Sequence, residues 1–130
     1  FIKLQNNRTF FLFGIYTNND IHIGNFTVRI NVENSRATIG VMIGDKNYWG
    51  KNVVNETRSI IIDWLFDKKG INKIKAGAMS INYPAIFNFL RQGWQNEGIT
   101  KDSYLIDEEN VDTVLFGITK TKWHKLSDKT

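Results

Sequence analysis

A change of hydrophobic period in the middle of the chain limits its fold more than any other feature. Residues 37–43 (ATIGVMI) are almost all apolar, which predicts a central strand covered on both faces. Across residues 53–69 the side chains instead alternate at helical spacing between an apolar and a polar side. The apolar side contains Val53, Thr57, Ile60, Ile61 and Trp64, and the polar side contains Glu56, Arg58, Asp63 and Asp67. A buried strand that leads into an amphipathic helix indicates an α/β fold.

The other elements follow from alternation and from turn-forming residues. Strands are expected at residues 9–16, 21–30, 71–80, 104–106 and 111–119, with turns at 17–20, 33–36 and 107–110. Gly70 is expected to end the first helix. Asn82 can cap a second helix, Pro84 fits its first turn, and Gly93 ends it. The predicted order of elements is β-β-β-α-β-α-β-β.

Length and composition exclude several classes of protein. The 130 residues suit one domain that spans residues 1–130. The absence of cysteine excludes a disulfide framework, a thiolate metal site and a cysteine nucleophile, and two histidines are too few for a three-histidine metal site. No apolar run approaches the roughly 18 residues that a membrane-spanning helix needs. We therefore expect a cytoplasmic protein with no metal and no membrane partner.

The junction between the central strand and the first helix, residues 44–52 (GDKNYWGKN), points to chemistry. A strand that turns through a glycine-bearing loop into a helix presents several backbone N–H groups without partners, and the helix dipole adds positive potential. Such a junction binds anions, phosphate groups among them. A plain strand-to-helix turn explains the same residues equally well, so the junction alone does not decide between the two.

The wider pattern resembles the acetyltransferase (GNAT) superfamily. Residues 39–45 (IGVMIGD), residues 48–51 (YWGK) and Glu56 follow one another as in that superfamily, and more closely as in the branch that contains the ribosomal-protein N-terminal acetyltransferases. The likeness continues through residues 71–76, Asn82, Ala85, residues 91–94, Glu97, Gly98, Asp112 and Trp123. The resemblance implies a central mixed, mostly antiparallel sheet with helices on both faces.

The resemblance also implies acetyl-coenzyme A as the cofactor and a primary amine as the acceptor. The pantetheine arm would lie along residues 37–43, and the diphosphate would rest on the N–H groups of residues 49–54. Asn82 corresponds to a residue that binds the pantetheine, and Arg91 to one near the ribose phosphate, although Arg91 also fits a solvated helix position. The candidate cofactor-binding residues are therefore Met42, Ile43, Trp49, Gly50, Lys51, Asn52, Val53, Val54, Asn82 and Arg91.

Several residues depart from the pattern of the family: Trp49, Asn52 and Val54 at the defined positions of its phosphate loop, Ala85 where a serine is common, and Phe89. Asn52 and Val54 stand where its phosphate loop has glycine or another small residue, since a side chain there crowds the diphosphate or demands an unfavourable backbone angle. Asparagine tolerates left-handed angles, whereas valine is β-branched. Phe89 replaces a tyrosine that protonates the leaving thiolate in many members. These departures support an alternative, a non-catalytic binding module with a degenerate phosphate loop.

The general base is left unassigned. His22 has a suitable intrinsic pKa, but a lone histidine at the start of a strand is more often structural. The branch has a glutamate near the position of Thr38, while Glu33 and Asp45 are expected in turns. Complete members also have a strand and two helices before the position of Thr9. Those helices form a wall of the acceptor pocket, and we expect these elements to be missing here.

Three acceptors fit an N-acetyltransferase: a protein N-terminus, a polyamine, and an amino sugar on a nucleotide carrier. Residues 13–16 (FGIY) and 22–25 (HIGN) resemble members that act in bacterial surface-sugar synthesis, which favours the amino sugar. The net charge of +4 suits an anionic ligand. No nucleic-acid partner is expected, because the lysines are scattered and no basic face with interleaved aromatic residues is present. A homodimer is left open.

Overall fold

The computed structural model describes residues 2–6, 9–44, 46–48 and 52–128. The predicted site residues Trp49, Gly50 and Lys51 lie outside this part of the chain. The chain divides into two compact units, Phe1–Ile74 and Lys75–Thr130, and each has strands and helices of its own. That the two units make one domain stays a prediction.

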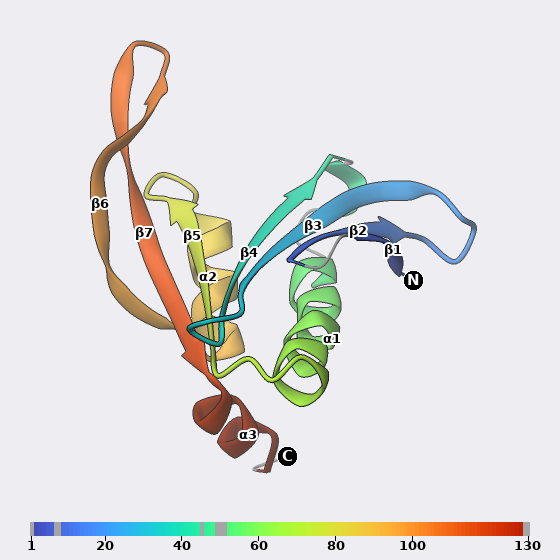
Figure 1. Ribbon diagram of the computed structural model, residues 1–130. Coiled ribbons are helices and arrows are strands. Elements are labelled where there is room, and N and C mark those ends of the chain that lie inside the picture. The colour runs from blue at the N-terminus through green and yellow to red at the C-terminus, as the bar shows by residue number, and fades with distance from the viewer. Residues whose placement is uncertain (1, 7–8, 45, 49–51, 129–130) are drawn as a thin grey trace. The chain divides into compact units, whose positions relative to one another are not determined.

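Four antiparallel strands form the sheet of the first unit. They are β1 (Ile2–Asn6), β2 (Phe10–Tyr16), β3 (His22–Asn31) and β4 (Arg36–Ile43), and each pairs with the next in that order (Figure 1). In β2 every second side chain is buried, because neighbouring side chains of a strand point to opposite faces. The last three strands confirm the sequence prediction, whereas β1 was not predicted.

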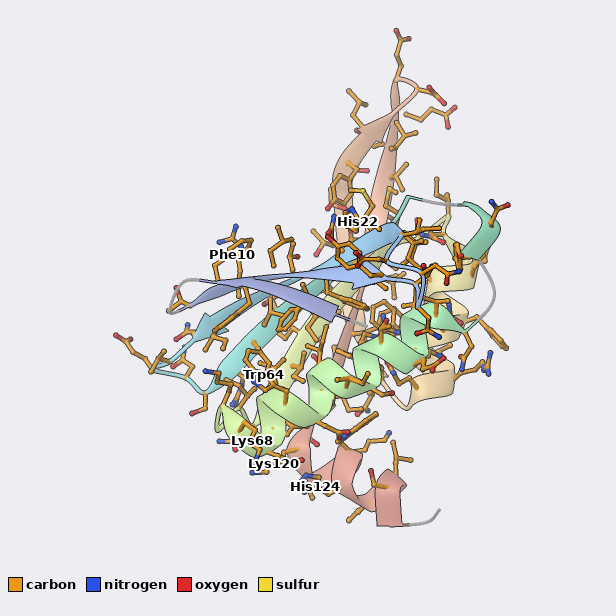
Figure 2. The ribbon with its side chains drawn as sticks, turned by 90° about the vertical axis from the view of Figure 1, so that its right-hand side faces the viewer. Phe10, His22, Trp64, Lys68, Lys120 and His124 are labelled. Atoms are coloured by element: carbon orange, nitrogen blue, oxygen red, sulfur yellow. The ribbon has the colours of Figure 1, made fainter. Side chains whose placement is uncertain are left out.

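The buried face of this sheet packs against α1 (Val53–Lys68). The buried side chains of α1 recur every three or four residues, and they are Arg58, Ile61, Ile62, Leu65 and Phe66. Trp64 meets the rings of Phe11 and Phe13 edge-on, with centroids 5.0 and 5.3 Å apart (Figure 2). Gly70 adopts a φ of 69°, which confirms it as the glycine that ends the helix.

Two expectations for the first unit are wrong. Ile60 is 57% exposed and Arg58 is only 1% exposed, so the buried stripe of α1 is rotated from the predicted one. Residues 60–62 are three consecutive isoleucines, and a helical period fits more than one stripe through such a run. The strand β4 is not covered on both faces, because Thr38 and Met42 are exposed.

The second unit combines a long hairpin with two helices. Its elements are β5 (Lys73–Met79), which begins at the boundary of the units, α2 (Tyr83–Gln92), β6 (Gln95–Ile106), β7 (Glu109–Thr119) and α3 (Lys120–Asp128), with β7 between β5 and β6 (Figure 1). The core is aromatic: Phe89 stacks on Phe116 at 4.6 Å between centroids and meets Trp94 edge-on at 5.1 Å. Gly93 has a φ of 99° and ends α2 as predicted.

β6 is far longer than the predicted strand at residues 104–106. Its pairing with β7 shifts register twice, between Asn96 and Gly98 and between Thr100 and Tyr104. Each shift breaks the alternation of side chains, and almost all side chains of β6 are exposed. The strand therefore left no periodic signal in the sequence.

The hairpin turn and the last helix also differ from the prediction. The turn is only Asp107–Glu108, and both residues have positive φ, as in a type I′ turn. Residues 109 and 110 belong to β7 instead. Helix α3 was not predicted, although its start carries a signal, since the hydroxyl of Thr119 accepts a hydrogen bond from the N–H of Lys122 at 3.2 Å.

The order of elements confirms the expected α/β fold class, with β1 added before it and α3 after it. Within the described ranges, no helix combines the length and apolar character needed to cross a membrane. In the same part of the chain, no group of three histidine, cysteine, aspartate or glutamate side chains is arranged to hold a metal ion.

Candidate functional site

The last residues of β4 present backbone groups on the edge that faces away from β3. The N–H of Gly44 donates to the carbonyl of Ile23 at 3.0 Å, so these two residues form a hydrogen-bonded pair. Such pairs alternate along an antiparallel ladder, and the register places Met42 in the next one. The backbone groups of Met42 therefore face β3, whereas those of Val41 and Ile43 point to the opposite edge. Of the two predicted pantetheine partners, Ile43 directs its backbone groups away from β3 and Met42 directs them toward β3; binding of the cofactor by either residue stays a prediction.

Helix α1 begins at a residue in the left-handed conformation. Asn52 has a φ of 62° and a ψ of 13°, and its side chain makes no capping hydrogen bond. Its carbonyl accepts from the N–H of Glu56 at 3.0 Å. The N–H groups of Val53 and Val54 lie in the first turn, where a helix offers its N–H groups no partner of its own. We call this start of α1 open in the sense that the helix itself offers these N–H groups no partner, and the helix dipole makes it attractive to an anion.

The two departures from the family pattern behave differently in this geometry. Asn52 adopts the left-handed angle that glycine takes most easily, as the sequence analysis expects of asparagine. Val54 lies within α1 and has a helical backbone, so it needs no unfavourable angle. Steric crowding of a bound diphosphate is the one objection to Val54 that remains.

A buried arginine lies one turn into the same helix. Arg58 is 1% exposed, and its Nη2 donates to Oδ1 of Asn55 at 2.9 Å. Burial removes the guanidinium from water and lowers the pKa of Arg58 to about 9. Asn55 is the third residue of α1, so the hydrogen bond ties Arg58 to the first turn. Arg58 was predicted on the polar side of the helix, but it precedes Ile61 and Ile62 at helical spacing, which is the signal for its burial.

A comparison with models of protein families identifies the family of this chain. Residues 1–95 match the model of the acetyltransferase (GNAT) domain. The chain belongs to this family. It is also 31% identical over 94 residues to the N-acetyltransferase p20 of Bacillus licheniformis, which covers 72% of this chain and 52% of the relative. The chain thus spans about half the length of that curated relative.

Solved structures of a spermidine N-acetyltransferase from Vibrio cholerae share the fold of this GNAT domain. The complex of that enzyme with CoA and spermine has a TM-score of 0.83 and 19% identity, over 90% of this chain and 69% of that chain. A dodecameric form in an intermediate state has a TM-score of 0.85 and 19% identity, over 93% and 71%. At such identity the likeness shows the fold alone. The resemblance to the ribosomal-protein branch stays a prediction.

Two further predicted site residues of this GNAT domain lie in the second unit. The side chain of Asn82 accepts a hydrogen bond from the N–H of Ala85 at 3.3 Å and caps α2. That bond uses the amide oxygen of Asn82, and its amide nitrogen is a donor in its own right. Arg91 is exposed, with its guanidinium over the ring of Phe87 at 5.7 Å from the centroid.

Phe89 is a core residue of the second unit. It lies against both Trp94 and Phe116 and is buried. The resemblance predicts that Phe89 stands where other members have a tyrosine, and a phenyl ring has no proton to give. A proton for a leaving thiolate therefore does not come from residue 89.

The candidate bases do not converge on one position. The Nε2 of His22 lies 2.9 Å from the carbonyl oxygen of Gly24 and 2.8 Å from Oδ1 of Asn25, and its ring stacks on Tyr16 (Figure 2). A carbonyl oxygen only accepts, so Nε2 carries the proton and donates it. These contacts support a structural role at the start of β3. Glu33 and Thr38 are exposed, and Asp45 lies outside the described residues.

Proposed function

We propose that this GNAT domain transfers the acetyl group of acetyl-coenzyme A to a primary amine. The observation that carries the proposal is the open start of α1, where an uncapped, left-handed Asn52 follows a strand with outward-facing backbone groups. Bound acetyl-coenzyme A would supply an acetyl group activated as a thioester. Membership of the family supports this choice of cofactor over other phosphate-bearing ligands.

The first unit is proposed to hold the pantetheine and the diphosphate. The amides of a pantetheine arm suit backbone groups of β4 that point away from β3, such as those of Val41, as an added strand does. The diphosphate suits the N–H groups of Val53 and Val54 at the positive end of the helix dipole. Met42 would contribute its exposed side chain in place of its backbone.

Asn82 and Arg91 stay predictions that come from the family resemblance. In the second unit, the amide nitrogen of Asn82 can donate to a pantetheine carbonyl, and the guanidinium of Arg91 suits the ribose phosphate. Trp49, Gly50 and Lys51 belong to the proposed phosphate loop.

The residues that are present indicate a slow reaction. A primary amine is mostly protonated at pH 7 and must lose a proton before its nitrogen can form the new C–N bond. As the C–S bond breaks, the thiolate is a fair leaving group, because the pKa of a thiol is about 8.5. Phe89 cannot protonate it, so the proton passes from the amine, directly or through water. A missing acid typically costs about 10²–10⁴ in rate.

For the acceptor we propose an amine that carries negative charge elsewhere, such as an amino sugar on a nucleotide carrier. The net charge of +4 attracts such a molecule and repels a polycation. A protein N-terminus is the second candidate. A polyamine, after which the Vibrio cholerae relatives are named, is the third, and the charge of this chain disfavours it.

The test combines cofactor binding with turnover. At about 100 times its dissociation constant, acetyl-coenzyme A should add about 2.7 kcal/mol to the free energy of unfolding. Release of the free thiol is then measured with a nucleotide-linked amino sugar, a peptide with a free N-terminus, and spermidine. An unchanged melting temperature at millimolar acetyl-coenzyme A would overturn the proposal. Stabilisation without turnover on all three amines would favour the non-catalytic module.

The oligomeric state is a separate question for the same samples. The sequence leaves a homodimer open, and one Vibrio cholerae relative is described as dodecameric. Light scattering of the purified protein, with and without acetyl-coenzyme A, distinguishes a monomer from a homodimer.

A further inference from the structure

Arg58 occupies a position where packing alone would favour an apolar side chain. Among the side chains that the structure describes, Arg58 is the one charged side chain that is buried. It continues the stripe of Ile61, Ile62 and Leu65 on α1. Burial of a guanidinium is unfavourable, as the lowered pKa of Arg58 reflects. Replacement of a buried charge together with its partners by apolar residues of similar volume is often neutral or stabilising. Packing of the apolar stripe therefore does not by itself explain Arg58.

One hydrogen bond of Arg58 reaches toward the start of α1. Its Nη2 donates to the side chain of Asn55, three residues nearer the N-terminus of the helix. Asn55 follows directly after Val53 and Val54, whose N–H groups form the open helix end. A full positive charge close to this end adds to the partial positive charge of the helix dipole. Both effects act on an anion at the start of α1.

We propose that Arg58 is a positioning residue of the diphosphate site: through Asn55 it holds the first turn of α1 in place, and its charge strengthens the attraction of that turn for a diphosphate. The inference rests on the proposed function. Arg58 is too buried to be a phosphate ligand itself. Its charge offsets the crowding that Asn52 and Val54 impose in a loop where the family has small residues.

The decisive experiment compares donors with and without phosphate. Arg58→Met places an apolar side chain of similar length in the buried stripe. Calorimetry gives the dissociation constants of acetyl-coenzyme A and of S-acetylpantetheine, which lacks the diphosphate and the nucleotide. We expect Arg58→Met to raise the dissociation constant of acetyl-coenzyme A by about tenfold or more and to leave that of S-acetylpantetheine unchanged. The salt dependence of acetyl-coenzyme A binding should become shallower, because one attracting charge is gone.

Two comparisons isolate the position and the phosphate. Lys68→Met removes the same charge from an exposed residue at the opposite end of α1, and both donors should bind as to the wild type. Dephospho-coenzyme A keeps the diphosphate and lacks the ribose phosphate. Arg58→Met should weaken the binding of dephospho-coenzyme A by the same factor as the binding of coenzyme A. An equal loss separates the effect of Arg58 from that of Arg91.

The outcomes separate this inference from the proposed function. If wild-type protein does not bind acetyl-coenzyme A, the proposed function fails. The inference is also wrong, and Arg58 is a structural residue, if the wild type binds but Arg58→Met leaves the affinity for acetyl-coenzyme A unchanged. The same holds if Arg58→Met lowers the affinity for both donors equally. Should Arg58→Met not fold, Asn55→Ala carries the test, since it cuts the link and keeps the charge. Asn55→Ala should then lower the affinity for acetyl-coenzyme A several-fold and leave the affinity for S-acetylpantetheine unchanged. An equal loss of affinity for both donors contradicts the inference.

Discussion

Helices α1 and α2 both begin after an asparagine, and the two asparagines act in opposite ways. Asn82 has a φ of −91° and closes the start of α2, because its side chain accepts a hydrogen bond from the first turn. Asn52 has a φ of 62°, and its side chain leaves the start of α1 uncapped. The residue type is the same, so the backbone angle decides whether a helix end is satisfied by its own chain or left for a ligand.

The first turns repeat this contrast. Pro84 stands second in α2 and brings no N–H group that needs a partner, which suits a helix end closed from within. Val54 stands second in α1 and does bring an N–H group, and the buried Arg58 lies behind it. The start of α2 is satisfied by its own chain, whereas the uncapped start of α1 and its buried cation are features that the proposed diphosphate site would explain.

The largest effect is expected from a negative charge placed at the second position of each helix. In Val54→Glu the carboxylate would face the diphosphate, and like charges in contact cost several kcal/mol. Affinity for acetyl-coenzyme A should fall by more than about 100-fold, while the protein without ligand keeps its melting temperature, since acidic residues favour a helix start. Pro84→Glu should change the affinity by less than about threefold. Equal effects of the two variants would mean that α1 holds no diphosphate.

The second prediction uses pH to expose the cost of the buried cation. Folding lowers the pKa of Arg58 to about 9, so the unfolded chain holds this proton more tightly. Charged Arg58 therefore opposes folding below pH 9, and the opposition is relieved as the pH rises above 9. At pH 7 the wild type bears the cost of burying this charge, and Arg58→Met removes that cost together with the hydrogen bond to Asn55.

The measurement is urea unfolding of both proteins between pH 7 and pH 10.5. The free energy of unfolding of Arg58→Met minus that of the wild type should fall as the pH rises, because the wild type alone gains stability when Arg58 loses its proton. A difference that stays constant with pH would show that Arg58 keeps its charge in the folded protein over this range.

The parts of the fold that could be predicted are those that depend on local chemistry. Asn82 and Gly93 were found at the two ends of α2, because caps and positive φ angles place demands on single residues. Strand β6 was mostly missed, because its side chains are exposed and its register shifts, so its state depends on hydrogen bonds to β7.

The site divides in the same way. The tolerance of Asn52 for a left-handed angle is a property of asparagine and was expected. The direction of the Met42 backbone groups depends on the register in which β4 pairs with β3. The residues of β4 alone do not predict this register. The burial of Arg58 depends on which of two adjacent stripes of α1 meets the sheet, and the run of isoleucines fits both.

The third prediction compares the two asparagines through stability. Asn82→Ala removes a capping side chain and should lower the free energy of unfolding by about 0.5–2 kcal/mol. Asn52→Gly removes no capping bond and gives the left-handed position to the residue that adopts it most readily, so the free energy should stay equal or rise slightly. Urea unfolding of both variants checks this. A loss in Asn52→Gly as large as that in Asn82→Ala would show that Asn52 caps α1 in solution.

The smallest effect is expected from restoring the family's small residues at the start of α1. Asn52 already has the left-handed angle and Val54 already has a helical backbone, so Asn52→Gly with Val54→Ala relieves crowding alone and corrects no angle. We expect the dissociation constant of acetyl-coenzyme A to tighten by about threefold, roughly 0.6 kcal/mol. S-acetylpantetheine should bind as before, because the crowding concerns the diphosphate. An unchanged or weaker affinity for acetyl-coenzyme A would mean that the native side chains contact the diphosphate favourably. The start of α1 would then be adapted to its own side chains, with Asn52 and Val54 as part of the site.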